Sequence, residues 1–70
     1  MTNDEFKALI VATCAAEDIH LETVERVECP PNDATCWAVL WIDGETREVE
    51  VDRDLGVEAM QVAILSQIRG

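Results

Sequence analysis

Positive charge is scarce in this chain, and its scarcity argues against direct contact with nucleic acid. The 70 residues contain five Lys and Arg against fifteen Asp and Glu, so the formal net charge is -10. Neutralising phosphates requires clustered Lys and Arg, whereas the five cations here are scattered along the whole chain. We therefore expect no direct binding to nucleic acid or to an anionic membrane, and we expect attraction to a basic partner.

Long apolar runs are also absent. No stretch approaches the roughly 18 consecutive apolar residues of a membrane span, and the opening Met1-Thr2-Asn3-Asp4-Glu5 is acidic where a signal peptide is basic. The three cysteines, an odd number in no tight motif, fit a reducing compartment better than a secreted disulfide framework. The sequence predicts a cytoplasmic protein.

Groups for catalysis and cofactor binding are few. His20 is the only histidine, and no local pattern places it beside a cysteine or Ser66 together with an orienting carboxylate. The glycines are isolated, which excludes a phosphate loop, and Asp52-Arg53-Asp54 lacks the further acidic ligand and the glycine of a calcium loop. We expect neither an enzyme nor a cofactor.

The cysteines do not form a recognisable metal site. Cys14, Cys29, Cys36 and His20 have the stoichiometry of a zinc site, but the paired short spacing of such sites is missing. We therefore expect no bound metal. Cys29 and Cys36 flank the first hairpin loop, so an adventitious disulfide under oxidation is compatible with the pattern.

The composition that is present is that of a small globular domain. With 49% apolar and 29% charged residues, the chain is too apolar for a disordered acidic tail. Its length lies near the lower limit for a single hydrophobic core, so residues 1–70 are expected to form one domain.

Two segments in the first half differ in period. Thr2 and Glu5 have the spacing of a capping box, and apolar residues then recur at helical spacing, which predicts a helix over residues 3–17. From about Glu22 the period changes to two, and Pro30 ends the predicted strand. Its two sides carry Thr23, Glu25, Val27 and Cys29 on one and Val24, Arg26 and Glu28 on the other.

The second half predicts a hairpin followed by a helix. Residues 35–42 are β-branched and aromatic, Asp43-Gly44 tolerates the positive φ angles of a tight turn, and residues 45–51 alternate. Asp52 or Asp54 is then expected to cap a second helix. Its apolar face comprises Val57, Met60, Ile64, Leu65 and Ile68. The predicted fold class is α+β, with two helices packed on a three-stranded antiparallel meander in the order α-β-β-β-α.

A two-residue turn fixes which side chains share a face of the sheet. With Asp43 and Gly44 as the turn, Ile42 pairs with Glu45, and the pairing continues along both strands. The predicted core face carries Cys36, Ala38, Leu40, Ile42, Val49 and Val51. The opposite face carries Trp37, Val39 and Trp41 beside Thr46, Glu48 and Glu50.

Two interpretations of this tryptophan face stay open. In the first, one helix covers each face, or a register slip turns the tryptophans inward, since Trp is ordinarily a core residue. In the second, the tryptophans form an interaction surface for a second copy or for a target, because Trp is enriched in binding hot spots.

Acidic residues crowd the second half of the chain. Seven of them fall within sixteen positions, namely Asp43, Glu45, Glu48, Glu50, Asp52, Asp54 and Glu58. They form either a solvated surface that keeps a small domain soluble or a negative surface that occupies a groove meant for nucleic acid. In the second case the carboxylates are spaced broadly like phosphates.

The segment Val11-Ala12-Thr13-Cys14-Ala15-Ala16-Glu17 is similar to the opening helix of an acidic type I anti-CRISPR family. The size, charge and predicted architecture also resemble the small acidic proteins that phages use against host defences. The resemblance implies a stoichiometric inhibitor in the host cytoplasm. Such an inhibitor binds the basic nucleic-acid groove of a CRISPR surveillance complex and prevents target DNA binding.

Under this hypothesis two groups of side chains contact the partner. Charge comes from Glu45, Glu48, Glu50, Asp52 and Asp54. Trp37, Val39 and Trp41 anchor either the target or a homodimer. The alternative function is a small homodimeric adaptor that binds another protein through the tryptophan face without imitating nucleic acid.

Overall fold

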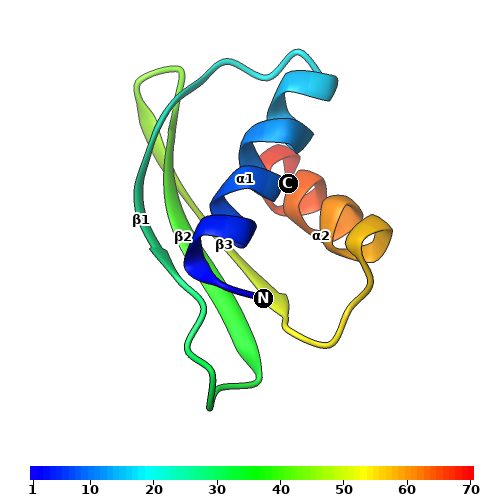
Figure 1. The fold of residues 1–70 in the computed structure, drawn as a ribbon. Helices are drawn as coiled ribbons and strands as arrows, with labels where there is room; N and C mark the ends of the chain where they lie inside the picture. Colours follow the sequence, from blue (N-terminus) through cyan, green and yellow to red (C-terminus); the bar gives the residue numbers. More distant parts are fainter.

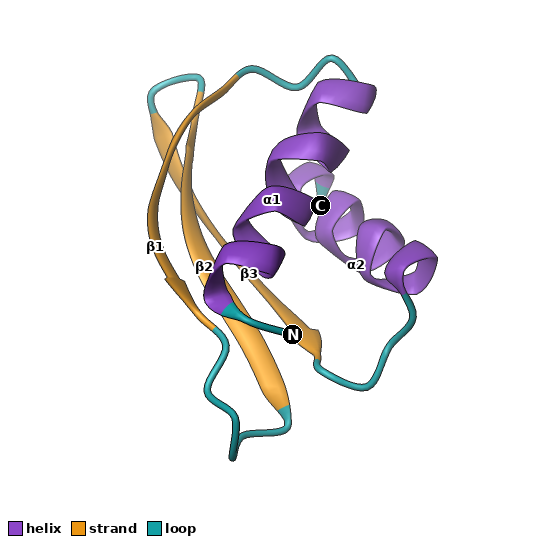
Figure 2. Ribbon diagram, viewed as in Figure 1, coloured by secondary structure: helices purple, strands orange, loops and turns teal.

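The computed structural model describes residues 1–70 and places both helices on one face of a three-stranded sheet (Figures 1 and 2). The elements are α1 (Asn3–Ala16), β1 (Leu21–Glu28), β2 (Thr35–Ile42), β3 (Glu45–Asp52) and α2 (Val57–Arg69). The strands are antiparallel in the order β1-β2-β3, which confirms the predicted α+β meander. Neither helix has the length and apolar character needed to cross a membrane.

The capping box predicted at the start of α1 is formed. Thr2 Oγ1 accepts a hydrogen bond from the backbone N–H of Glu5 at 3.1 Å, and the Thr2 N–H donates to Glu5 Oε1 at 2.8 Å. The hydrogen bond from the Thr2 backbone N–H to the carboxylate, followed by one from the Thr2 side chain, lowers the pKa of Glu5 because each favours the charged form. The helix buries Phe6, Ile10, Thr13 and Cys14 against the sheet, and burial raises the pKa of the Cys14 thiol.

The hairpin of β2 and β3 has the predicted register. Asp43 and Gly44 adopt φ angles of 52° and 80°, as a two-residue turn requires. Pairing then runs without interruption from Ile42 opposite Glu45 to Thr35 opposite Asp52. The predicted core face is confirmed, since all six of its side chains are buried: Cys36, Ala38, Leu40, Ile42, Val49 and Val51.

Strand β1 departs from the predicted alternation. Register shifts lie between Leu21 and Thr23 and between Val24 and Arg26, and each bulge adds a residue that turns the following side chains to the other face. Leu21, Val24 and Val27 consequently pack against the core at every third position. The predicted separation of Val24 from Val27 is therefore wrong.

The second helix begins differently from the prediction. Gly56, and neither Asp52 nor Asp54, occupies the N-cap position, and no side chain caps the helix. Asp52 is the last residue of β3, and Asp54 lies in the turn that follows. Met60, Ile64 and Ile68 are buried as predicted, whereas Val57 is 56% exposed at the first turn.

Contacts around Cys29 join the N-terminus to two loops. Cys29 and Cys36 form a disulfide across the β1–β2 loop, and the Cys29 N–H donates to Asn3 Oδ1 at 2.6 Å. The Arg53 guanidinium donates to the carbonyls of Cys29, Pro30 and Met1. The disulfide fulfils the pairing expected under oxidation and removes the cysteine-based argument for a reducing compartment.

The two loop glycines are expected to respond in opposite ways to substitution. Gly44→Ala places a β-carbon in the left-handed region at φ 80° and should cost about 1–2 kcal/mol of unfolding free energy. Gly56→Ser meets open space and adds a capping hydroxyl, so it should gain about 0.5 kcal/mol. Urea unfolding of both variants measures the two signs. Equal effects would contradict the turn and cap geometry.

Candidate protein-binding surface

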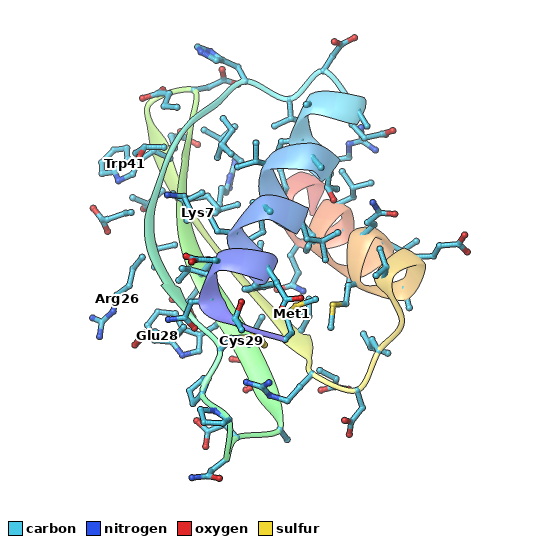
Figure 3. The ribbon with its side chains drawn as sticks, viewed as in Figure 1. Met1, Lys7, Arg26, Glu28, Cys29 and Trp41 are labelled. Atoms are coloured by element: carbon cyan, nitrogen blue, oxygen red, sulfur yellow. A yellow bond between two sulfur atoms is a disulfide. The ribbon has the colours of Figure 1, made fainter.

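The face of the sheet turned away from the helices carries the two tryptophans, which are half-buried among their neighbours on the sheet. We call this surface the outer sheet face. It consists of Trp37, Val39 and Trp41 on β2, of Thr23, Glu25, Arg26 and Glu28 on β1, and of Thr46, Glu48, Glu50 and Asp52 on β3. Figure 2 shows no element over it, and in Figure 3 Trp41, Arg26 and Glu28 project from this side.

Both arrangements that would bury the tryptophans are wrong. The two helices share the opposite face, and the β2–β3 register has no slip. Trp37, Val39 and Trp41 are half-buried by their neighbours within the sheet, whereas Ala38 and Leu40 between them are fully buried. The tryptophan stripe therefore lies at the surface, where a partner can reach the rings.

Trp41 is oriented by a carboxylate from β1. Its Nε1–H donates to Glu25 Oε1 at 3.0 Å. The bond satisfies the only polar atom of the indole and holds the Glu25 carboxylate beside the ring. The other carboxylate oxygen of Glu25, Oε2, accepts no hydrogen bond within the protein. The apolar surface of the Trp41 ring and an anionic acceptor therefore lie next to each other.

The Arg26 guanidinium lies over the Trp37 ring. The Arg26 Cζ atom lies 5.3 Å from the centroid of the Trp37 ring, within the range of a cation–π contact. An Arg26 nitrogen is also 4.0 Å from Glu28 Oε2. Trp37, Arg26 and Glu28 thus form a small cluster at the end of the face opposite Trp41.

The outer sheet face is strongly acidic. Five carboxylates, those of Glu25, Glu28, Glu48, Glu50 and Asp52, flank the tryptophan stripe on both sides, and Arg26 is the one cation among them. Because the flanking groups are exposed or half-exposed, their negative field extends into solvent.

The structure brings together only part of the predicted acidic group. Glu48, Glu50 and Asp52 lie on the outer sheet face, as alternation along β3 requires. Glu45 has the opposite parity and pairs with Arg47 at 3.3 Å on the helix side, and Asp54 lies in the turn before α2. Glu25 and Glu28 were missed because their orientation depends on the bulges in β1.

The edges of the sheet are less available than its outer face. Gln67 of α2 pairs with the free backbone groups of Glu50, since its Oε1 accepts from the Glu50 N–H at 2.8 Å and its Nε2–H donates to the Glu50 carbonyl at 2.7 Å. At the other edge, the bulges of β1 interrupt the regular ladder that an added strand would need. A partner is therefore better accommodated on the face.

The one hollow on the surface lacks a recognisable set of catalytic or metal-binding side chains. It has a volume of about 540 Å³ and lies near the β2–β3 turn, lined by Asp18, Ile19, His20, Ile42, Asp43, Glu45, Arg47 and Ile68. His20 is exposed and its Nδ1 lies 3.7 Å from Asp43 Oδ1. No cysteine or serine borders the hollow, and no group of three His, Cys, Asp or Glu side chains is placed to hold a metal.

Comparison with known protein families, curated proteins and solved structures finds no match to this chain. The outer sheet face is consequently the main basis for a functional proposal. It is the place where exposed aromatic area and concentrated charge coincide.

Truncation of adjacent residues on β2 separates a core role from a binding role. Leu40→Ala removes a fully buried side chain and should cost about 2–5 kcal/mol of unfolding free energy. Trp41→Ala removes a half-buried ring on the outer sheet face and should cost clearly less. Urea unfolding compares the two variants. A loss at Trp41 as large as that at Leu40 would show that the ring is needed for folding.

Proposed function

We propose that the protein is a small acidic inhibitor that occupies a basic nucleic-acid-binding surface of a host defence complex and blocks target DNA binding. The resemblance of α1, size and charge to anti-CRISPR proteins suggests the class of complex. The observation that carries the proposal is the outer sheet face, which combines an uncovered tryptophan stripe with carboxylates on both sides. Such an inhibitor acts in the cytoplasm of the host.

The spacing of carboxylates on β3 suits a surface made for a nucleic-acid strand. Glu48, Glu50 and Asp52 point to one side at every second residue, which corresponds to intervals of about 7 Å. A nucleic-acid strand carries one phosphate per about 3.4 Å of helix axis. Measured along the helix axis, successive carboxylates on β3 therefore correspond to about every second phosphate of a strand.

Charge favours a basic target over a second copy of the chain. Each copy has a formal charge of -10, and two outer sheet faces in contact would bring ten carboxylates together against two Arg26 side chains. Like charges opposed in an interface are costly. The homodimeric adaptor is consequently the weaker candidate, although the tryptophan stripe alone would suit it.

Charge reversal on the outer sheet face is expected to abolish inhibition. The double variant Glu48→Lys, Glu50→Lys should weaken inhibition of target DNA binding by more than about tenfold, because it replaces attraction by repulsion. Fluorescence anisotropy of labelled target DNA on type I CRISPR surveillance complexes measures this effect.

A matched control changes the same number of charges elsewhere. Glu45 lies on the helix side of β3 and Glu58 is exposed in the first turn of α2. The variant Glu45→Lys, Glu58→Lys should inhibit nearly as well as the parent. Inhibition lost equally in both variants would point to net charge alone, and inhibition kept in both would contradict the nucleic-acid-mimic proposal.

Kinetics should separate the roles of charge and aromatic contact. Raising the salt concentration from about 0.05 M to about 0.5 M should lower the association rate with the target complex about tenfold or more, with little effect on dissociation. Trp41→Ala should instead raise the dissociation rate, since a hot-spot ring acts after docking. Surface plasmon resonance measures both rates. An association rate independent of salt would argue against electrostatic steering.

A further inference from the structure

The contact between Arg26 and Trp37 points to the chemistry of the partner. We propose that the outer sheet face binds the arginine side chains of an extended, arginine-rich protein segment. This inference rests on the basic partner of the proposed function. In the free protein Arg26 occupies one of two arginine sites, formed by Trp37 with Glu28. The second site, formed by Trp41 with Glu25, is open.

The occupied site shows which group fits. The Arg26 guanidinium lies 5.3 Å from the Trp37 ring centroid, and one of its nitrogens lies 4.0 Å from Glu28 Oε2, so it is placed over a ring face and beside a carboxylate. Its side chain remains 65% exposed. An exposed ion pair of this kind is weak, and an incoming guanidinium can take its place at small cost.

The open site repeats the same pair of groups. The Trp41 ring is held by its hydrogen bond to Glu25 Oε1 at 3.0 Å, and the carboxylate keeps an oxygen for a second donor. No cation of the chain lies over the Trp41 ring. A guanidinium from a partner would find there the combination that Arg26 finds at Trp37.

The distance between the sites suits an extended segment. Trp37 and Trp41 are four residues apart on one strand, which places them about 13 Å apart along β2. Two arginines four positions apart in an extended peptide point to the same side at the same interval. The neighbouring Glu48 and Glu50 supply further acceptors along the path.

Arginine fits these sites better than lysine does. A guanidinium is planar, stacks on an indole ring and offers several donors in a fixed fork, whereas an ammonium is a compact and strongly hydrated charge. Charge complementarity also selects the occupant, because a second copy of this acidic chain or a nucleic acid would be repelled by the five carboxylates of the face.

Two peptides and two variants test the inference. Octa-arginine and octa-lysine carry the same charge, and titration calorimetry at about 0.15 M salt gives their dissociation constants. Arg26→Ala frees the Trp37 ring, whereas Arg47→Ala removes the same charge from the helix side of β3. The parent should prefer octa-arginine about two- to fivefold, and Arg26→Ala should bind it about two- to fivefold more tightly than Arg47→Ala does.

Further variants guard against an indirect effect. The double variant Arg26→Ala, Trp37→Leu should lose the gain for octa-arginine, and circular dichroism checks that each variant is folded. Equal affinity of Arg26→Ala and Arg47→Ala for octa-arginine would overturn the inference. An equal gain for octa-lysine would overturn it as well, and so would a dimer of Arg26→Ala in sedimentation without peptide, since a second copy would then occupy the face.

The anisotropy assay with labelled target DNA tests the proposed function independently of the arginine inference. If inhibition of DNA binding depends on Glu48 and Glu50 but the peptides show no arginine preference, the arginine inference fails and the inhibitor proposal stands. If the Arg26 effect is present but no surveillance complex is inhibited, the inhibitor proposal fails and the arginine sites stand.

Discussion

The register of the β2–β3 hairpin is the constraint on which the rest of the structure depends. Side chains alternate along a strand, so a slip of one residue would exchange Leu40 with Trp41 between the two faces. The two-residue turn at Asp43 and Gly44 prevents this slip because both residues adopt positive φ angles. The turn thereby determines both the hydrophobic core and the outer sheet face.

One-sided coverage of the sheet follows from the same register. The core face of β2 and β3 presents six buried side chains, and both helices have an apolar side that needs such a surface. Phe6 and Ile10 of α1 and Met60 and Ile64 of α2 all bury there. No helix or strand of residues 1–70 lies over the other face of the sheet (Figure 2).

The hairpin could be predicted because its signals lie within short segments of the sequence. The bulges of β1 could not, because they depend on how the strand pairs with β2. The capping box at Thr2 and Glu5, the turn and the alternation of β3 all lie within short segments, and the structure has them as expected. The bulges of β1 adjust its pairing with β2, and no residue type in the strand signals where they occur. Glu25 and Glu28 were therefore missed, and Glu45 was placed in the acidic group although alternation already separates it from Glu48.

Half-buried tryptophans at a protein surface are an aggregation hazard, and three features of the outer sheet face oppose self-association. Carboxylates on both flanks repel a second copy, the bulged β1 and the Gln67 side chain obstruct the sheet edges, and Arg26 covers one ring. The carboxylates act against an acidic chain, whereas the obstructed edges act against an added strand of any charge. Under the arginine proposal, a basic segment binds on the face and not at an edge. The carboxylates attract it there, and its guanidinium displaces Arg26. Under that proposal, protection against self-association and specificity for arginine arise from the same side chains.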